Sequence, residues 1–197
     1  MLGLVVDGRN GDYGNLEWRA MTQAEDLKNV LWRLRAEKKA KFNRRVSIGD
    51  LLAERDELAE FYGWGKGTTC YDNVLVLGDV RIGKNTWIGP NVVLDGSSGL
   101  TIGDNCTICA GVQIYTHDSV KWALSGGQHP YELSPTSIGS NCFIGPNAVI
   151  ARGVTIGDRV AVGACTFVNK SIETGGKFTG AVISALPKPR SQDKEQP

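Results

Sequence analysis

The sequence predicts an all-β solenoid of stacked coils, with a helical segment before it and a long loop inserted into it. Three observations support this fold class. An aliphatic residue recurs every six positions over residues 74–172 apart from two interruptions, the position four later is small or β-branched, and the position three later is mostly Asn or Gly. No helix and no two-sided strand produces a period of six. Self-similarity at a fixed period is typical of stacked repeats.

Each repeat is interpreted as one short strand and one tight corner. The aliphatic side chain points into the core, a small side chain fits at the corner, and Asn or Gly adopts the left-handed backbone that the corner requires. Three strands close a triangular coil, and coils stack about 4.8 Å apart. Thirteen repeats supply four or more coils, and their aliphatic residues are Val76, Ile82, Ile88, Leu94, Ile102, Ile108, Ile114, Ile138, Ile144, Ile150, Ile156, Val162 and Val168.

Residues 1–70 follow a different pattern and are predicted to be a helical segment. Residues 24–41 form an amphipathic pattern, and a second helix, capped by Ser47 or Asp50, is expected to run to about Tyr62. We expect these helices to cover one open end of the solenoid and to meet neighbouring subunits. The stretch 33–45 holds seven basic residues and one acidic residue. It suits an anionic sugar nucleotide or a membrane surface, although a solvated helix face is the simpler interpretation.

The solenoid is assigned to residues 71–172, with the loop 115–136 inserted, and residues 173–197 form a C-terminal extension. The final PKPRSQDKEQP has no apolar pattern and is predicted to be a disordered tail. The net charge of +1 gives no global field for nucleic acid or membranes. No secretory signal and no membrane-spanning run is recognised, so a cytoplasmic location is expected. The Cys106–Cys109 spacing invites a metal or redox interpretation, but small core residues kept reduced explain it better.

Two interruptions of the repeat carry the functional prediction. Two extra residues stand between Leu94 and Ile102, and a much longer insertion between Ile114 and Ile138 contains both histidines of the chain. A solenoid wall needs no insertions, so loops pushed out of it are natural places for a site. His117 follows Ile114 by three residues, on a rigid element at the mouth of the loop. Histidine accepts a proton near neutral pH, so His117 is a candidate general base, with a structural histidine as the alternative.

The repeat pattern over residues 74–172 resembles the left-handed parallel β-helix of the hexapeptide-repeat acyltransferases. The segment AGVQIYTHD resembles the element that carries the catalytic histidine in the maltose, galactoside and xenobiotic acetyltransferase branch, and His117 is the matching residue. The likeness is strongest to the sugar O-acetyltransferases of lipopolysaccharide and other surface-polysaccharide synthesis. It implies a left-handed coil, acetyl-CoA as donor, no metal, and a homotrimer with each site between two solenoids. His117 lies nearer its core aliphatic than in the galactoside and maltose enzymes, which leaves the acceptor sugar open.

The resemblance also implies further site residues. The CoA arm is expected along the coils that follow the loop, and the matching positions are Gly145, Pro146, Ala164, Asn169 and Lys170. Wall geometry alone explains Gly145 and Ala164 almost as well. Asp95 is expected to orient His117 or bind a sugar hydroxyl, with corner capping as the alternative. The candidate acceptor contacts are Asp118, Trp122, His129 and Tyr131, although Trp122 also suits anchoring the loop on a neighbour.

The function predicted is acetyl transfer from acetyl-CoA to a hydroxyl of a sugar or surface-polysaccharide precursor. N-acetylation of an amino sugar on a nucleotide carrier would use the same wall and donor, and stays open. A zinc enzyme like the γ-class carbonic anhydrases on this fold needs three histidine ligands, and the chain has two histidines. A non-catalytic scaffold predicts no acyl-CoA binding and no effect of changing His117.

Overall fold

The computed structural model describes residues 13–175 and 177–178. Its internal contacts divide the chain into two compact units, Met1–Glu54 and Arg55–Pro197, which are described separately. The predicted tail at 187–197 lies outside the described residues. None of the described helices combines the length and the apolar character needed to cross a membrane.

The N-terminal unit contains a long helix, α1 (Tyr13–Phe42), and a single turn, α2 (Gly49–Leu52). The predicted helix 24–41 is confirmed and begins eleven residues earlier than expected. The prediction of one helix from residue 47 or 50 to 62 is wrong, because Ala53 adopts an extended backbone and separates α2 from α3 (Arg55–Phe61). Ser47 does act near the start of α2: its hydroxyl accepts the Asp50 N–H at 3.4 Å and donates to the Asp50 carboxylate at 2.6 Å.

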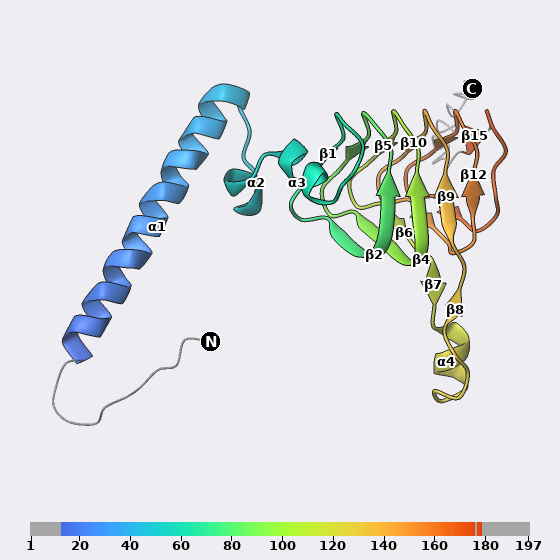
Figure 1. The fold of residues 1–197 in the computed structure, drawn as a ribbon, viewed down its shortest axis with the longest axis horizontal. Helices are drawn as coiled ribbons and strands as arrows, with labels where there is room; N and C mark the ends of the chain where they lie inside the picture. Colours follow the sequence, from blue (N-terminus) through green and yellow to red (C-terminus); the bar gives the residue numbers. More distant parts are fainter. Residues whose placement is uncertain (1–12, 176, 179–197) are drawn as a thin grey trace, which may run out of the picture. The chain divides into compact units, whose positions relative to one another are not determined.

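The second unit is a parallel β-solenoid with three strand faces (Figure 1). The first face contains β1 (Thr69–Cys70), β3 (Trp87–Ile88), β5 (Thr107–Ile108), β10 (Phe143–Ile144), β13 (Ala161–Val162) and β15 (Lys177–Phe178). The second face contains the first halves of β2 (Leu75–Ile82) and β4 (Val93–Ile102), then β6 (Gln113–Ile114), β11 (Val149–Ile150) and β14 (Phe167–Val168). The third contains the second halves of β2 and β4, then β9 (Thr136–Ile138) and β12 (Thr155–Ile156).

The core is the column of side chains predicted from the repeat. All thirteen aliphatic residues are buried except Val76, which is half-buried in the first coil. Equivalent residues lie directly above one another, as the register of Ile108, Ile144 and Val162 shows. The predicted left-handed corners are confirmed at five Asn residues, which are Asn85, Asn91, Asn105, Asn141 and Asn147. Cys106 and Cys142 are buried free thiols in successive coils, with the Cys142 N–H 3.5 Å from Cys106 Sγ.

Helix α3 packs against β1 and closes the first end of the solenoid core. Ala59 of this helix and Trp64 after it are buried in the core cluster. The Trp64 indole N–H donates to the carbonyl oxygen of Val80 at 3.1 Å, which satisfies its one polar atom. The expectation that a helix covers an open end therefore holds for α3.

Both interruptions leave the solenoid at one corner, between the second and third faces. β4 runs through this corner in the second coil and includes the first interruption, residues 95–100. The long insertion leaves after β6 and returns at β9, which is the same corner one coil later. It projects from the wall as β7 (His117–Asp118), α4 (Val120–Leu124) and β8 (Glu132–Leu133) (Figure 1). We call this place the loop corner; it brings the two segments into contact.

Candidate active site

The loop corner joins Asp95 and His117 in a hydrogen-bonded pair. Asp95 lies in β4 and its side chain is fully buried, whereas His117 in β7 is 32% exposed. The His117 Nδ1 atom is 2.6 Å from Asp95 Oδ2. An ionised carboxylate only accepts hydrogen bonds, so Nδ1 carries the proton and the neutral ring leaves Nε2 unprotonated. Within the described residues Nε2 has no hydrogen-bond partner, so it is available to accept a proton.

Asp95 is held as a carboxylate by a set of donors. Ser97 donates its N–H at 3.0 Å and its hydroxyl at 2.5 Å, and Thr116 donates its N–H at 2.7 Å and its hydroxyl at 3.2 Å. Burial alone raises the pKa of Asp95, but the hydrogen bonds from Ser97, Thr116 and His117 outweigh it and hold the pKa well below its usual value. The carboxylate therefore stays charged beside the imidazole at any pH near neutral.

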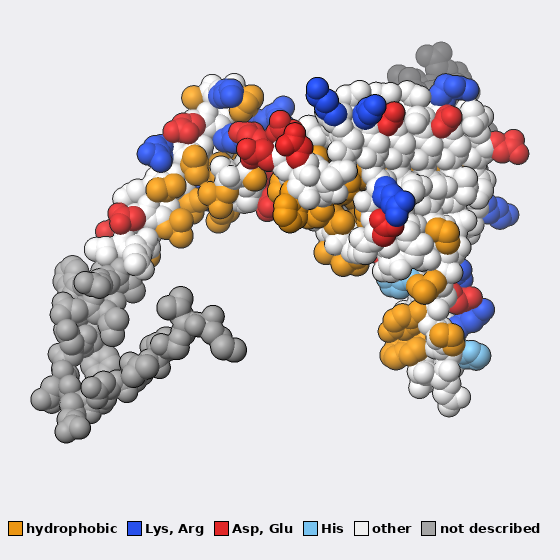
Figure 2. Space-filling model, viewed as in Figure 1, with side chains coloured by type: hydrophobic (Ala, Val, Ile, Leu, Met, Phe, Trp, Pro, Cys, Tyr) orange, Lys and Arg blue, Asp and Glu red, His pale blue; other side chains and the backbone are white. Residues whose placement is uncertain are grey.

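The loop forms an antiparallel hairpin with an aromatic surface near the histidine. His117 pairs with Leu133 across β7 and β8. The Tyr131 ring lies 6.3 Å from the His117 ring and 5.5 Å from the Trp122 ring, measured between centroids. Several apolar side chains of the hairpin are exposed (Figure 2), namely Val120, Trp122, Leu124, Tyr131 and Leu133. Of the two predicted aromatic acceptor contacts, Tyr131 thus lies beside His117 and Trp122 packs against Tyr131.

An ion-pair network fixes this hairpin to the next coil. Arg152 follows β11 at the loop corner and pairs with Asp118 and, at 3.0 Å, with Glu132. Lys121 pairs with Glu132 at 2.8 Å. The Arg152 guanidinium holds the pKa of the Asp118 carboxyl below its ordinary value. The predicted acceptor contact Asp118 is therefore engaged by Arg152 in this structure.

Sequence reasoning missed Arg152, Ser97, Thr116 and Glu132. A signal for Arg152 was available, because it follows the core residue Ile150 by two positions and so falls at the loop corner. Of the other predicted contacts, His129 is exposed, and the structure records a hydrogen bond only from its backbone N–H, to Ser125 Oγ at 2.9 Å.

The residues predicted to contact CoA fall at two corners. Gly145, Pro146 and Ala164 lie between the first and second faces, where the Cys165 N–H donates to the Pro146 carbonyl at 2.8 Å. Asn169 and Lys170 are exposed after β14, at the loop corner of the last coil. The Gly145 N–H is used within the wall, since it donates to the Val162 carbonyl at 2.9 Å. A Cβ at Gly145 would lie 2.6 Å from the Ala164 nitrogen, so close stacking of coils requires this glycine.

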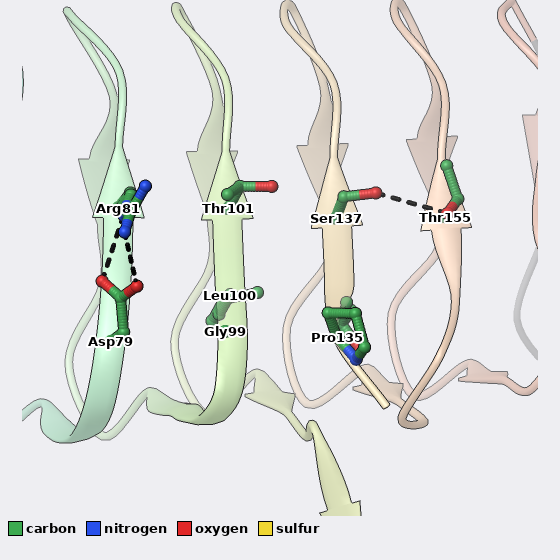
Figure 3. A pocket seen from close by; sticks show the side chains of 9 residues that line it. Asp79, Arg81, Gly99, Leu100, Thr101, Pro135, Ser137 and Thr155 are labelled. Atoms are coloured by element: carbon green, nitrogen blue, oxygen red, sulfur yellow. Dashed lines mark hydrogen bonds and ion pairs between the residues drawn. The ribbon is translucent and has the colours of Figure 1, made fainter. Parts of the chain in front are cut away.

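A shallow depression of about 360 Å³ lies on the third face beside the loop corner (Figure 3). Gly99 of the first interruption and Pro135 at the end of the long loop line it. Outward hydroxyls from successive coils also line it, and Ser137 Oγ donates to Thr155 Oγ1 at 3.3 Å. The depression therefore adjoins both interruptions. Among the described residues, no three His, Cys, Asp or Glu side chains are gathered as a metal ion would require.

Comparison with known proteins agrees with this fold. The family model of the bacterial transferase hexapeptide (six repeats) matches residues 135–170, and that of the hexapeptide repeat of succinyl-transferase matches residues 79–116. The galactoside O-acetyltransferase of Escherichia coli K12 is 32% identical over 117 residues, covering 59% of this chain and 57% of that protein. The putative colanic acid biosynthesis acetyltransferase WcaF of the same strain is 32% identical over 116 residues, covering 50% of this chain and 64% of that protein.

Among solved structures, a mutant of AntD, an N-acyltransferase from Bacillus cereus, in complex with dTDP and coenzyme A, is similar with a TM-score of 0.54 and 25% identity. The match covers 60% of this chain and 68% of that one. The chain thus spans 57% and 64% of the two acetyltransferases named above. The repeat, the wall and the two matched segments agree, and they make the chain similar to the hexapeptide-repeat acyltransferases.

Proposed function

We propose that the protein transfers an acetyl group from acetyl-CoA to a hydroxyl of a sugar or a surface-polysaccharide precursor, with His117 as general base. The observation that carries the proposal is the 2.6 Å contact between His117 Nδ1 and the buried Asp95 carboxylate. It leaves Nε2 as a proton acceptor at the base of the hairpin, where β7 leaves the wall. The similarity to a galactoside O-acetyltransferase supports a sugar acceptor, and the CoA-bound AntD complex supports a CoA thioester donor.

In the proposed reaction, Nε2 removes the acceptor hydroxyl proton while the oxygen attacks the thioester carbonyl. The tetrahedral intermediate then collapses, the carbon–sulfur bond breaks, and the CoA sulfur takes the proton back from Nε2. Asp95 keeps the ring in the required tautomer and stabilises the imidazolium that forms in between. General-base catalysis of this kind contributes about 10²–10⁴-fold in rate. Backbone N–H groups at a coil edge are the proposed donors to the oxyanion.

A covalent acyl-cysteine intermediate is not part of the proposal. Cys109 is the cysteine nearest to His117 in the sequence. Burial raises the pKa of the Cys109 thiol, which lowers the fraction of nucleophilic thiolate at neutral pH. Direct transfer needs no such intermediate.

N-acetylation of an amino sugar on a nucleotide carrier is the second candidate. The similarity to AntD, an N-acyltransferase crystallised with dTDP, favours it. The same base would remove a proton from the attacking amine. The two candidates differ in the acceptor alone, so an acceptor panel separates them.

The test is acetyl-CoA turnover against simple sugars, polysaccharide precursors and nucleotide-linked amino sugars, with His117→Ala beside the unchanged protein. We expect thiol release with a hydroxyl acceptor and its loss in His117→Ala, by about 10²-fold or more. Unchanged turnover in the variant overturns the role of His117. Absence of acetyl-CoA binding in both proteins favours a non-catalytic scaffold. A homotrimer, also proposed, predicts a solution mass three times that of the 21.2 kDa chain.

A further inference from the structure

A groove in the N-terminal unit is lined by cations and has an aromatic wall. Its volume is about 570 Å³, and six of the residues that line it are Trp32, Arg35, Lys39, Asn43, Arg44 and Arg45. The first three are spaced by three and four residues, so they share one face of α1. Asn43 ends the helix with a positive φ of 50° and donates its N–H to the Lys39 carbonyl at 2.9 Å. This left-handed ending returns Arg44 and Arg45 to the same groove.

The charge of this region stands out against the rest of the chain. Residues 33–45 hold seven basic residues and one acidic residue, a net +6, whereas the whole chain is +1, so the remainder is −5. Two of the three cations outside the groove are paired, since Arg33 lies 3.9 Å from Glu37 and Lys38 lies 2.6 Å from Glu54, whereas Lys41 lies 4.9 Å from the Phe42 ring centroid. Among the residues that the structure describes, no carboxylate pairs with the four cations of the groove, which are Arg35, Lys39, Arg44 and Arg45.

The helix dipole explains only part of this arrangement. Cations in the last turn of a helix are favourable, which accounts for Lys39 and Lys41. It does not account for a concave surface that gathers four unpaired cations beside Trp32. The Trp32 side chain is 59% exposed, and the Arg35 guanidinium lies 5.1 Å from its ring centroid. A groove of this volume falls in the range of small-molecule sites.

We propose that this groove binds the diphosphate of a nucleotide, with the base against Trp32 and the phosphates held by Lys39, Arg44 and Arg45. Arginine forks match phosphate oxygens, and an indole offers a flat face to a base. The groove is lined wholly by residues 32–51, so it shares no residue with the His117–Asp95 pair. The inference does not rest on acetyl transfer, and it stands or fails separately from it.

The test is calorimetric titration of the full chain with UDP and with inorganic pyrophosphate at low and moderate salt. We expect both to bind, more weakly as salt rises, because the contacts are ionic. The triple variant Lys39→Gln/Arg44→Gln/Arg45→Gln is expected to lose roughly ten-fold or more in affinity for both ligands. Trp32→Ala is expected to weaken UDP more than pyrophosphate. Arg33→Gln, on the same helix but paired with Glu37, is the matched control and should leave both affinities unchanged.

Three results overturn the proposal: neither ligand binds, the triple variant binds as well as the unchanged protein, or only anionic phosphatidylglycerol vesicles bind. An equal effect of Trp32→Ala on both ligands refutes the stacking of the base. Circular dichroism checks that the triple variant folds, and the single Arg44→Gln variant replaces it if it does not. Titration of His117→Ala separates this site from the acetyl-transfer site, since its affinity for UDP should be unchanged.

Discussion

Replacing Asp95 by Asn tests the proposed base most directly. The exchange keeps the side-chain volume and leaves Oδ1 to accept the Ser97 N–H at 3.0 Å, whereas the amide nitrogen takes the place of Oδ2, which accepts the Thr116 N–H at 2.7 Å. It places an uncharged amide 2.6 Å from His117 Nδ1 in place of a carboxylate. An amide N–H facing Nδ1 favours the tautomer protonated at Nε2, which cannot accept the acceptor proton.

The expected fall in kcat follows from the loss of general-base catalysis. If the wrong tautomer predominates, the general-base contribution is lost, so kcat should fall by about 10²–10⁴-fold. The same exchange in a Ser-His-Asp triad lowers kcat by about 10⁴-fold. Because no group that contacts the acceptor is changed, the KM for the acceptor should stay within about three-fold. The imidazole ¹⁵N shifts should move from the Nδ1–H form toward the Nε2–H form.

The matched control is Asp79→Asn. Asp79 lies at the same corner one coil earlier, but it is exposed and pairs with Arg81 at 2.8 Å. Its replacement should leave kcat unchanged. The reasoning fails if Asp95→Asn retains full activity with the ring still in the Nδ1–H form, or if both variants lose activity equally.

Four further outcomes are expected. Arg152→Gln should lower kcat/KM by roughly ten- to a hundred-fold, because it frees the hairpin that carries the base; steady-state kinetics with an unaltered fold by circular dichroism checks it. Ile144→Ala should cost about 2–5 kcal/mol in urea unfolding, since its side chain is fully buried, whereas the half-exposed neighbour Phe143→Ala should cost much less. Cys165→Asn should stabilise the fold by about 0.5–1 kcal/mol, because Cys165 holds a φ of 56° that Asn tolerates; a higher Tm supports this, and a lower one contradicts it. The pKa of Asp95 is lower in the folded protein than in the unfolded chain, where it is about 3.9. The ionised Asp95 therefore contributes its full stabilisation above about pH 3.9 and loses it as the pH falls through the folded-state pKa. The free energy of unfolding from pH 6 to pH 2 should fall more steeply in the unchanged protein than in Asp95→Asn.

The wall was predictable because its physics is local and periodic. Each core position needs an aliphatic side chain, and each corner needs a residue that tolerates a left-handed backbone. Both requirements therefore appear in the sequence at a fixed spacing. Arg159 and Cys165 are exceptions, because they hold positive φ without being Asn or Gly. The split of the second helix was not predictable in this way. The break at Ala53 depends on one extended residue within a segment that otherwise has helical composition.

The site was predictable only in part, for a related reason. His117 stood out because it lies where the repeat is interrupted. Asp95 was a candidate with several possible roles, since contact between residues 22 apart depends on both interruptions leaving at the same corner. Arg152 lies in a regular repeat, where its position two residues after Ile150 was the one signal that it falls at the loop corner. The register between coils decides which of these residues come into contact, and the sequence pattern alone does not give that register.

The burial of Asp95 is itself an argument that the loop corner serves chemistry. Burying an ionised carboxylate is costly unless hydrogen-bond donors surround it. Other coils place Leu77, Ala151 and Asn169 at the equivalent position, so the wall does not require an acid there. Here the donors come from Ser97 in the first interruption and from Thr116 and His117 at the start of the second. The two interruptions therefore form one unit, in which the shorter one positions the carboxylate and the longer one carries the base that it orients.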